Sequence, residues 1–442
     1  MSIINHPEIE MIDPAVLKLD TNNARRHPER QLVKLTAAIR RFGFRLPMLI
    51  DEDDTIVAGH ARWKAALRLK LDLVPVIRTQ FLDEDERRAF MLADNRLAEL
   101  GEWDTKALQR ELGALFDNGF DIELTGFSTK DLDFALVADD VNDKDEVERV
   151  ELPDPNTDAV TRTGDLWIIG EHRLLCADTR EGESWERLLG EKRADILFAD
   201  PPYNVPINGF VSGLGQHRHR EFAMAAGELT APEFTMFLRQ VFRLCVAYSR
   251  AASIHYHCMD WRHMRELLDA ADGVYSEFKQ LVVWDKGTGG MGTFYRSQHE
   301  LVFAFKSGRG QHVNNFGLGE TGRYRTNVVS YPGANTFRKG RAEDLAAHST
   351  VKPTALVADF LLDCSNRGDL VVDPFVGSGT TLLAAARTGR RSAGIEIDPL
   401  YVDTALARLA QVTGVAPVLE SDGRSFDEIA AARREREGEA VR

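Results

Sequence analysis

The chain has 442 residues, of which 43% are hydrophobic and 28% are charged. This composition excludes a mostly disordered or fibrous protein, and the length is typical of two or three globular domains. The net charge of −14 alone argues against a nucleic-acid partner. However, residues 296–341 hold eight basic residues and two acidic ones, so an acidic chain can still present one basic surface to phosphates.

The sequence shows no targeting segment and little cysteine chemistry. No apolar run of about 18 residues predicts a membrane span, and the first residues, MSIINHPEIEMIDP, lack the pattern of a secretory signal. The four cysteines (Cys176, Cys245, Cys258 and Cys364) are too few and too scattered for a disulfide framework. We therefore expect a cytoplasmic protein with no membrane partner.

An acidic segment divides the chain. Residues 131–158 contain eleven acidic residues and two basic ones, together with prolines. Such a composition predicts a solvated linker, which we place at 139–160. The sequence then predicts a domain over 1–138, a larger domain over 161–420, and a charged tail over 421–442 that forms a frayed helix.

The first domain mixes helical and strand patterns, which predicts a small α+β fold. Apolar residues at helical spacing predict a helix that ends at Gly43. Two short strands around an acidic turn follow, and a second helix begins directly after Gly59. The remaining expected elements are a strand at 74–79, an amphipathic helix at 86–100 and a smaller helical region to about residue 138.

The second domain alternates strands with helices. A hairpin is expected at 164–178, a buried strand ends at Asp200, and a strand, a Gly-rich turn and a helix follow over 370–390. Residues 391–409 repeat the unit of strand and helix. This alternation predicts an α/β fold with a doubly wound parallel sheet, whose ligands bind at the carboxyl ends of the strands.

One of these strand ends carries the turn DPFVGSGTT, residues 373–381. Its glycines let the backbone approach a ligand closely, and the helix that follows offers free N–H groups. Glu396 ends the next strand, at a spacing that suits a carboxylate accepting hydrogen bonds from ribose hydroxyls. Because Leu382 replaces the third glycine of a dinucleotide fingerprint, an adenosine ligand without phosphates is better supported than NAD.

A second strand end carries Asp200-Pro201-Pro202-Tyr203. Because proline has no N–H, this turn presents hydrogen-bond acceptors, namely the Asp200 carboxylate and the proline carbonyls. Acceptors suit an exocyclic amine, which offers two N–H donors. The Tyr203 ring can stack on an aromatic base.

Together, DPPY and DPFVGSGTT resemble the motifs of the DNA amino-methyltransferases, which transfer a methyl group from S-adenosylmethionine (AdoMet) to adenine N6 or cytosine N4. DPPY precedes the Gly-rich turn, as in the β class of that family. The segment HSTVKP at 348–353 resembles the HxTxKP element, and Trp284-Asp285-Lys286, Tyr295-Arg296 and His299-Glu300 are similar to the stretch after the catalytic strands. The resemblance covers about residues 164–409 and implies a Rossmann-like, doubly wound methyltransferase fold.

The resemblance implies AdoMet as the cofactor and double-stranded DNA as the partner, with a base flipped out of the duplex. The leading Asp200 favours adenine N6. The implied catalytic residues are Asp200, Pro201, Pro202 and Tyr203. The implied cofactor-binding residues are Asp178 beside the adenine, Thr350 and Lys352 near the methionine portion, Glu396 at the ribose, and Asp373, Phe375, Gly377, Gly379 and Thr380 in and after the Gly-rich turn.

Target recognition in this class usually lies between the catalytic turn and HxTxKP, here about residues 206–345. Basic residues of this region are candidates for contacts with phosphates or bases. They are Arg218, Arg220, Arg296, Arg323, Arg325, Arg338, Lys339 and Arg341. Residues 209–215 form a Gly-containing loop that is expected to order over DNA.

The first domain resembles the ParB/sulfiredoxin-like domain, because Gly59-His60-Ala61-Arg62 and the residues after it are similar to the GxxRxxAA box. Such a box can hold a phosphate at a helix N-terminus, which implies a nucleotide partner at Gly59, His60 and Arg62. Asn22, Arg25 and His27 lie in a stretch similar to the entry loop of that family. ParB-like domains joined to DNA methylases occur in phage and prophage settings.

Several alternatives remain open from the sequence. The chain could be a ParB-like binding protein with a non-catalytic methyltransferase half, or the same chemistry could act on cytosine N4, on RNA or on a protein amide. A metal site at His255, His257 and Cys258 is not expected, since no second cluster stands at a recognisable spacing. The sequence does not decide the recognition site, a cognate restriction enzyme or a homodimer.

Overall fold

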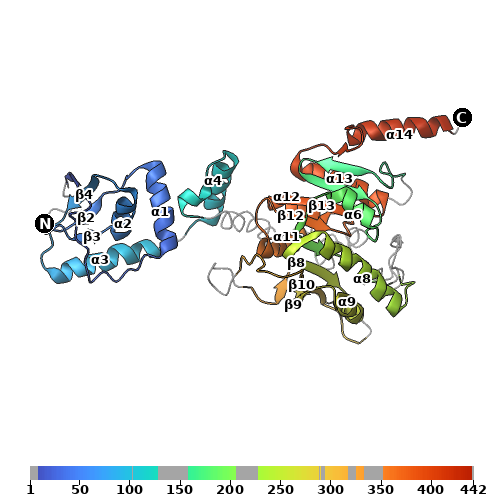
Figure 1. Cartoon of the computed structure of the whole chain (residues 1–442), viewed down its shortest axis with the longest axis horizontal. Coiled ribbons are helices and arrows are strands. Elements are labelled where there is room, and N and C mark those ends of the chain that lie inside the picture. The colour runs from blue at the N-terminus through green and yellow to red at the C-terminus, as the bar shows by residue number, and fades with distance from the viewer. Residues whose placement is uncertain are drawn as a thin grey trace. The chain divides into compact units, whose positions relative to one another are not determined.

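The structure is a computed structural model that describes residues 8–101, 103–127, 158–205, 227–287, 289, 294–316, 325–332 and 352–440. The chain divides into two compact units, 1–136 and 137–442, which are described separately (Figure 1). Over the described ranges, no helix is both long and apolar enough to cross a bilayer.

The small unit contains a four-stranded sheet with the order β1-β4-β2-β3. Strand β4 pairs antiparallel with β1 and parallel with β2, and β2 and β3 form the antiparallel pair around the acidic turn. Its core contains Met48, Ile50, Ile56, Val74 and Val76. The strands are β1 (Ile9–Ile12), β2 (Met48–Ile50), β3 (Ile56–Ala58) and β4 (Val74–Arg78).

The helices expected before Gly43, after Gly59 and at 86–100 are present in the small unit, the last of them at 84–99. At the end of α1, Gly43 has a φ of +83° and its N–H donates to the Ile39 carbonyl. Asp83 caps α3 by accepting from the Glu86 N–H. The helices are α1 (Glu29–Phe42), α2 (His60–Leu69), α3 (Glu84–Glu99), α4 (Thr105–Asp117) and the 3-10 helix η1 (Ile122–Thr125). The predicted helical region beyond residue 127 lies outside the described residues.

The large unit is built on a ten-stranded sheet with the order β11-β9-β10-β8-β7-β12-β13-β6-β5-β14. The strands are β5 (Leu166–Ile169), β6 (His172–Cys176), β7 (Ala194–Ala199), β8 (Ser249–Met259), β9 (Glu277–Asp285), β10 (His299–Lys306), β11 (Val328–Ser330), β12 (Leu370–Asp373), β13 (Arg391–Glu396) and β14 (Val418–Leu419). The α/β class is confirmed. The expected parallel centre runs from β8 to β6, the pair β9–β11 is also parallel, and antiparallel pairs, including the predicted hairpin β5–β6, flank the centre.

Helices cover both faces of this sheet, as the alternation of its strand residues requires. On β7, Ile196 and Phe198 pack in a cluster with α11, whereas Leu197 and Ala199 pack in a cluster with α6 and α8. The helices are α6 (Gly182–Leu189), α8 (Ala231–Ala247), η2 (Trp261–His263), α9 (Met264–Ala271), α11 (Thr354–Cys364), α12 (Thr380–Arg387), α13 (Pro399–Thr413) and α14 (Phe426–Ala440). The sheet is therefore doubly wound.

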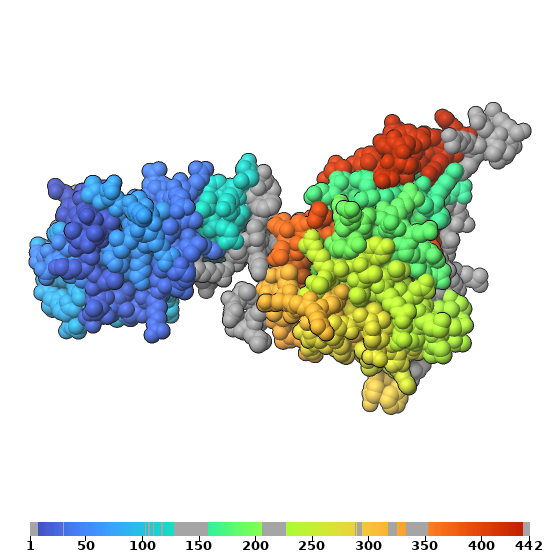
Figure 2. All heavy atoms as spheres, in the orientation of Figure 1, coloured from blue at the N-terminus to red at the C-terminus, as the bar shows by residue number. Residues whose placement is uncertain are grey.

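The charged tail forms a helix whose beginning is anchored. The Phe426 ring lies 5.3 Å from the Trp167 ring, and Arg433 Nη1 lies 2.7 Å from Asp165 Oδ2. In Figure 2 the red atoms of α14 lie against the green atoms of the β5–β6 hairpin. The predicted helix is confirmed, and its first turns are packed because Ile429 is buried.

Candidate active site

The topology brings the two motif-bearing turns together. Strands β7 and β12 are parallel neighbours, and β13 pairs parallel with β12 on the other side. The carboxyl ends of parallel strands meet at one edge of a sheet. Asp200, Asp373 and Glu396 therefore lie at neighbouring strand ends, although the chain visits them in distant segments.

Hydrogen bonds occupy both oxygens of the Asp200 carboxylate. The Tyr203 hydroxyl donates to Oδ1 over 2.8 Å, and Lys352 Nζ donates to Oδ2 over 2.7 Å. Each carboxylate oxygen has two acceptor positions, and the Asp200 side chain keeps 28% of its surface exposed. Asp200 can therefore still accept from a ligand.

Asn204 fixes the end of this turn. It has a φ of +52°, a left-handed conformation that asparagine tolerates better than most residues. Its amide donates to the Leu229 carbonyl and accepts from the Gly227 and Leu229 N–H groups. The turn is thereby tied to the residues that precede α8.

An ion-pair chain extends from Asp200. Lys352 Nζ is also 3.1 Å from Glu300 Oε2, and Lys286 Nζ is 2.6 Å from Glu300 Oε1. The sequence predicts Lys352 near the methionine portion of a cofactor, which stays a prediction; in the structure its ammonium group contacts the Asp200 carboxylate. Lys286 and Glu300 belong to the family-like stretch of the sequence, but the sequence alone gave neither residue a role.

The pKa shifts in this chain follow from burial and charge pairing. Burial raises the pKa of Asp200, and nearby Glu300 adds to that rise, while Lys352 opposes it. Burial alone would raise the pKa of Glu300, but its two lysine partners outweigh it and lower that pKa to about 2. For Lys352, the two carboxylates outweigh burial and raise the pKa. Glu300 and Lys352 are therefore both charged at neutral pH.

The Gly-rich turn is held by two carboxylates. Glu396 accepts from the Gly377 N–H over 2.7 Å and from the Asp398 N–H over 2.9 Å. Asp373 accepts from the Phe375 N–H over 2.8 Å and is only 2% exposed. Burial raises the pKa of both carboxyl groups to about 7. Asp373 thus supports the turn from inside, and its predicted contact with a cofactor stays a prediction.

The two glycines of this turn have different requirements. Gly379 has a φ of +92°, and a Cβ there would lie 2.9 Å from the Ala405 Cβ, so α12 and α13 approach closely. Gly377 has a φ of +51°, and a Cβ there would meet no atom of the described residues within 4 Å. Within the described structure the space beside Gly377 is therefore open, whereas Gly379 serves packing.

The other predicted cofactor residues lie around these turns. Asp178 follows β6 and accepts from the Arg180 guanidinium, whose hydrogen bonds outweigh burial and lower the Asp178 pKa. The Phe375 ring lies 6.1 Å from the Phe237 ring. Thr380 begins α12 and is buried, and Thr350 lies outside the described residues.

Comparison with known proteins assigns both units. Residues 194–407, which include both turns, match the N6/N4 DNA methylase family. The part of the large unit that matches this family is called the methylase domain. Residues 3–96 match the ParB N-terminal domain, and residues 106–163 match the ParB-methyltransferase HTH domain.

The chain is also similar to two type II methyltransferases and to solved structures. The type II methyltransferase M.HpaI of Haemophilus parainfluenzae is 25% identical over 256 residues, which are 54% of this chain and 74% of that protein. M.ScaI of Streptomyces caespitosus is 38% identical over 88 residues, 20% of this chain and 29% of that protein. Among solved structures, the M1.HpyAVI–SAM complex is 18% identical with a TM-score of 0.38, covering 53% of this chain and 98% of that one.

Two of the basic residues proposed to contact DNA are described. Arg296 is exposed in the connection between β9 and β10 of the methylase domain. Arg325 is not free for a phosphate, because its guanidinium forms ion pairs with Asp359 and Asp363 of α11 at 2.8 and 2.9 Å. The others lie outside the described residues, namely Arg218, Arg220, Arg323, Arg338, Lys339 and Arg341, as do residues 209–215.

We call the small unit the ParB-type unit, because its residues 3–96 match the ParB N-terminal domain. The predicted phosphate box of this unit lies at the start of α2. Gly59 has a φ of +105° and precedes the helix. His60 is 6% exposed, and its Nε2 has no hydrogen-bond partner among the residues that the structure describes. Arg62 donates to the Leu46 carbonyl over 3.3 Å. In the upstream stretch, Arg25 donates to the Asn95 side chain over 2.8 Å.

His255 and His257 belong to the core of the methylase domain. His257 Nε2 lies 2.7 Å and His255 Nδ1 lies 3.1 Å from the Tyr275 hydroxyl, and both rings are fully buried. Burial lowers the pKa of His255 to about 3. No group of three or more potential metal ligands occurs among the residues that the structure describes.

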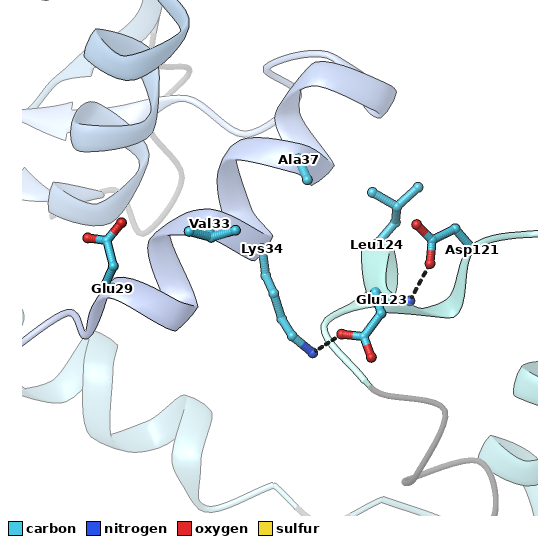
Figure 3. A pocket seen from close by; sticks show the side chains of 7 residues that line it. All are labelled: Glu29, Val33, Lys34, Ala37, Asp121, Glu123 and Leu124. Atoms are coloured by element: carbon cyan, nitrogen blue, oxygen red, sulfur yellow. Dashed lines mark hydrogen bonds and ion pairs between the residues drawn. The ribbon is translucent and has the colours of Figure 1, made fainter. Parts of the chain in front are cut away.

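A pocket also lies within the ParB-type unit, between α1 and η1 (Figure 3). Lys34 crosses it and pairs with Glu123 over 2.7 Å. The pocket is lined by Glu29, Val33, Lys34, Ala37, Asp121, Glu123 and Leu124. It contains none of the residues that the sequence singled out.

Proposed function

We propose that this chain transfers a methyl group from AdoMet to the exocyclic amine of a flipped base in double-stranded DNA, and that the base is adenine and the atom N6. The observation that carries the proposal is Asp200, a partly exposed carboxylate at the end of β7 beside the Gly-rich turn. The family match of residues 194–407 and the SAM complex of M1.HpyAVI support the methyl donor.

The residues at the ends of β12 and β13 suit AdoMet. The open space beside Gly377 in the described structure leaves room for a ligand, and the Glu396 carboxylate has four acceptor positions, more than the Gly377, Asp398 and Ile397 N–H groups fill. Phe375 supplies an aromatic surface at the same turn, and Asp178 an acceptor for the adenine. When bound, AdoMet supplies a methyl group on a positively charged sulfur.

The amine of adenine is a poor nucleophile, because its lone pair is delocalised into the ring. The Asp200 carboxylate and the Pro201 carbonyl accept the two N–H groups, which favours a more pyramidal nitrogen with an available lone pair. The carboxylate also stabilises the positive charge that develops on that nitrogen as the N–C bond forms and the S–C bond breaks. The nitrogen then loses one N–H proton, which passes by way of the carboxylate to solvent. Tyr203 stacks on the base and orients it, while Arg296 contacts the DNA backbone outside the turn.

Product analysis tests this proposal. The purified chain is incubated with AdoMet and unmethylated duplex DNA, and the digested nucleosides are separated by mass. We expect N6-methyladenine, and none with the Asp200→Ala variant. N4-methylcytosine instead would overturn the base assignment. AdoMet binding without any methylated nucleoside, in DNA or in RNA of the same sequence, would overturn the activity and favour a non-catalytic binding protein.

For the ParB-type unit we infer a nucleotide site at Gly59, His60 and Arg62. The unpartnered Nε2 of the buried His60 beside a helix N-terminus supports it. Titration calorimetry with each nucleoside triphosphate tests this site on the full chain. We expect binding that His60→Ala weakens at least about tenfold, while Lys64→Ala, a change on the same helix, does not; equal affinity in all three proteins would contradict the site.

A further inference from the structure

Four side chains at the methylase site form one row of alternating charges. Lys286 at the end of β9 contacts Glu300 on β10, Glu300 contacts Lys352 before α11, and Lys352 contacts Asp200 after β7. The three closest N–O distances are 2.6, 3.1 and 2.7 Å. Lys352 is 7% exposed and Glu300 is 16% exposed, so solvent screens these pairs weakly.

We propose that Lys352 and Glu300 are positioning residues for methyl transfer, which together fix the orientation and the charge of the Asp200 carboxylate. This inference rests on the proposed function and adds two residues to it. The family resemblance gave Lys352 to the cofactor and gave Glu300 no role. Their contacts assign both to the amine-binding carboxylate.

Orientation follows from the hydrogen bonds. Lys352 donates to Oδ2 of Asp200 and Tyr203 donates to Oδ1, so the plane of the carboxylate is fixed on both sides. The Lys352 ammonium also lies 5.3 Å from the centre of the Tyr203 ring, within the range of a cation–π contact. One lysine therefore touches both the group that accepts the amine and the ring that stacks on the base.

Charge follows from the surroundings of Asp200. The Asp200 carboxylate accepts an amine N–H more strongly when it is ionised, yet burial raises the Asp200 pKa. Within the described structure, Lys352 is the cation in contact with it. The other titratable groups that face Asp200 are acidic or neutral: Glu300 of β10, Tyr203 of the same turn, Cys258 of β8 and Asp373 of β12.

Glu300 tunes the same carboxylate in the opposite direction. Its negative charge raises the pKa of Asp200, and it shares the Lys352 ammonium with Asp200. Lys286 in turn neutralises Glu300. Removing Lys352 and removing the charge of Glu300 should therefore move the ionisation of Asp200 in opposite directions, which general damage to the fold would not do.

The first experiment measures single-turnover methyl transfer to duplex DNA between pH 5.5 and 9 for the wild type, Lys352→Met and Glu300→Gln. On the acid side of the pH profile, which we call the acid limb, the rate falls as Asp200 becomes protonated. For Lys352→Met we expect this limb to move to higher pH by at least about one unit, so that the rate at pH 6.5 falls at least about tenfold. For Glu300→Gln the acid limb moves to lower pH. Lys352→Arg retains the cation and restores the wild-type limb at least in part.

The matched control is Lys279→Met, which removes the lysine that pairs with Glu277 over 2.9 Å at the other end of β9. Its acid limb and its AdoMet affinity should equal those of the wild type. The inference would be overturned if the wild type is active and the acid limb of both variants, Lys352→Met and Glu300→Gln, either stays where it is in the wild type or moves in the same direction.

A second measurement does not depend on activity. Carboxyl ¹³C NMR of aspartate-labelled full-length chain gives the titration midpoint of Asp200, assigned by the signal that Asp200→Asn removes. We expect Lys352→Met to raise this midpoint by at least about one unit and Glu300→Gln to lower it. If these shifts occur in a chain that methylates no base, the proposed function fails and the charge coupling stands; if the midpoints coincide, the coupling fails.

Discussion

The dipeptide Asp-Pro ends two neighbouring strands of the methylase domain, β7 and β12, and the two carboxylates have different surroundings. Asp200 is bound by an ammonium group and a phenol, and 28% of its side chain is exposed. Asp373 is bound by the Phe375 N–H and is 2% exposed. The same sequence at the same edge of a sheet thus gives one carboxylate that can meet a ligand and one that holds a turn.

The difference shows that partners, and not the dipeptide, decide the role. A cation beside Asp200 favours its charged form, whereas burial without a described cation contact raises the pKa of Asp373 to about 7. Glu396 resembles Asp373, since its pKa is also about 7 and backbone N–H groups bind it. We expect substitutions at the two turns to affect different quantities.

The largest effect should come from Asp200→Asn. The amide keeps the volume of the side chain but loses the negative charge and one acceptor, so we expect the single-turnover rate to fall by about 10²–10³-fold or more. AdoMet affinity, measured by calorimetry, should stay within about twofold because Asp200 faces the amine. A variant rate above one tenth of the wild-type rate would contradict the role proposed for Asp200 and, with it, the contrast between Asp200 and Asp373.

The glycines separate packing from binding in the second turn. Gly379→Ala forces a Cβ against Ala405, and we expect a loss of about 2–3 kcal/mol in the free energy of unfolding. Gly377→Ala meets open space, so its cost is the backbone strain of about 1–2 kcal/mol. Urea unfolding gives both values, and AdoMet titration should show the larger relative loss for Gly377→Ala. Equal losses of stability would contradict this division.

Glu396 should make AdoMet binding depend on pH. Its pKa of about 7 means that the carboxylate, the stronger acceptor for ribose hydroxyls, is lost as the pH falls through 7. We expect affinity to decrease from pH 8 to pH 6 in the wild type. Glu396→Gln should bind about tenfold more weakly at pH 8 and lose most of this dependence. A parallel dependence in the variant would assign the titration to another group.

The smallest effect should appear in the stability of Asp373→Asn. The folded pKa of Asp373 is raised above its ordinary value of 3.8 to about 7. Its contribution to stability is therefore complete below about pH 4 and is lost as the pH rises through 7. The melting temperature of the wild type should fall over that range, and Asp373→Asn should fall less steeply. An identical slope would show that Asp373 does not titrate there.

Motifs predicted the elements and the turns, because local patterns encode them. Gly43 ends α1 and Gly59 precedes α2 as expected. The DPPY turn and the Gly-rich turn each follow the strand that was predicted before them. The ion-pair chain was beyond local patterns: Lys352 and Asp200 are 152 residues apart in the sequence. The sequence tells us that a lysine in a motif is positively charged, but its ion-pair partner depends on which strands become neighbours in the sheet.

The sheet illustrates the same limit. Strand and helix alternation predicted a parallel centre, but the sequence analysis assigned no strand to the segments of β8, β9 and β10, whose antiparallel pairing depends on register between them. Arg325 is a further example, since a basic residue in a basic region suggested DNA, and two acids on α11 bind it instead. Burial cannot be read from charge alone.

The most direct test of the account is single-molecule sequencing of DNA from methylation-deficient cells that express the wild-type chain or the Asp200→Asn variant. The account predicts N6-methyladenine within one sequence motif in the first sample and its absence in the second. Equal modification in both samples would contradict the role of Asp200, and no modification in either, with both proteins folded and binding AdoMet, would contradict DNA methylation itself.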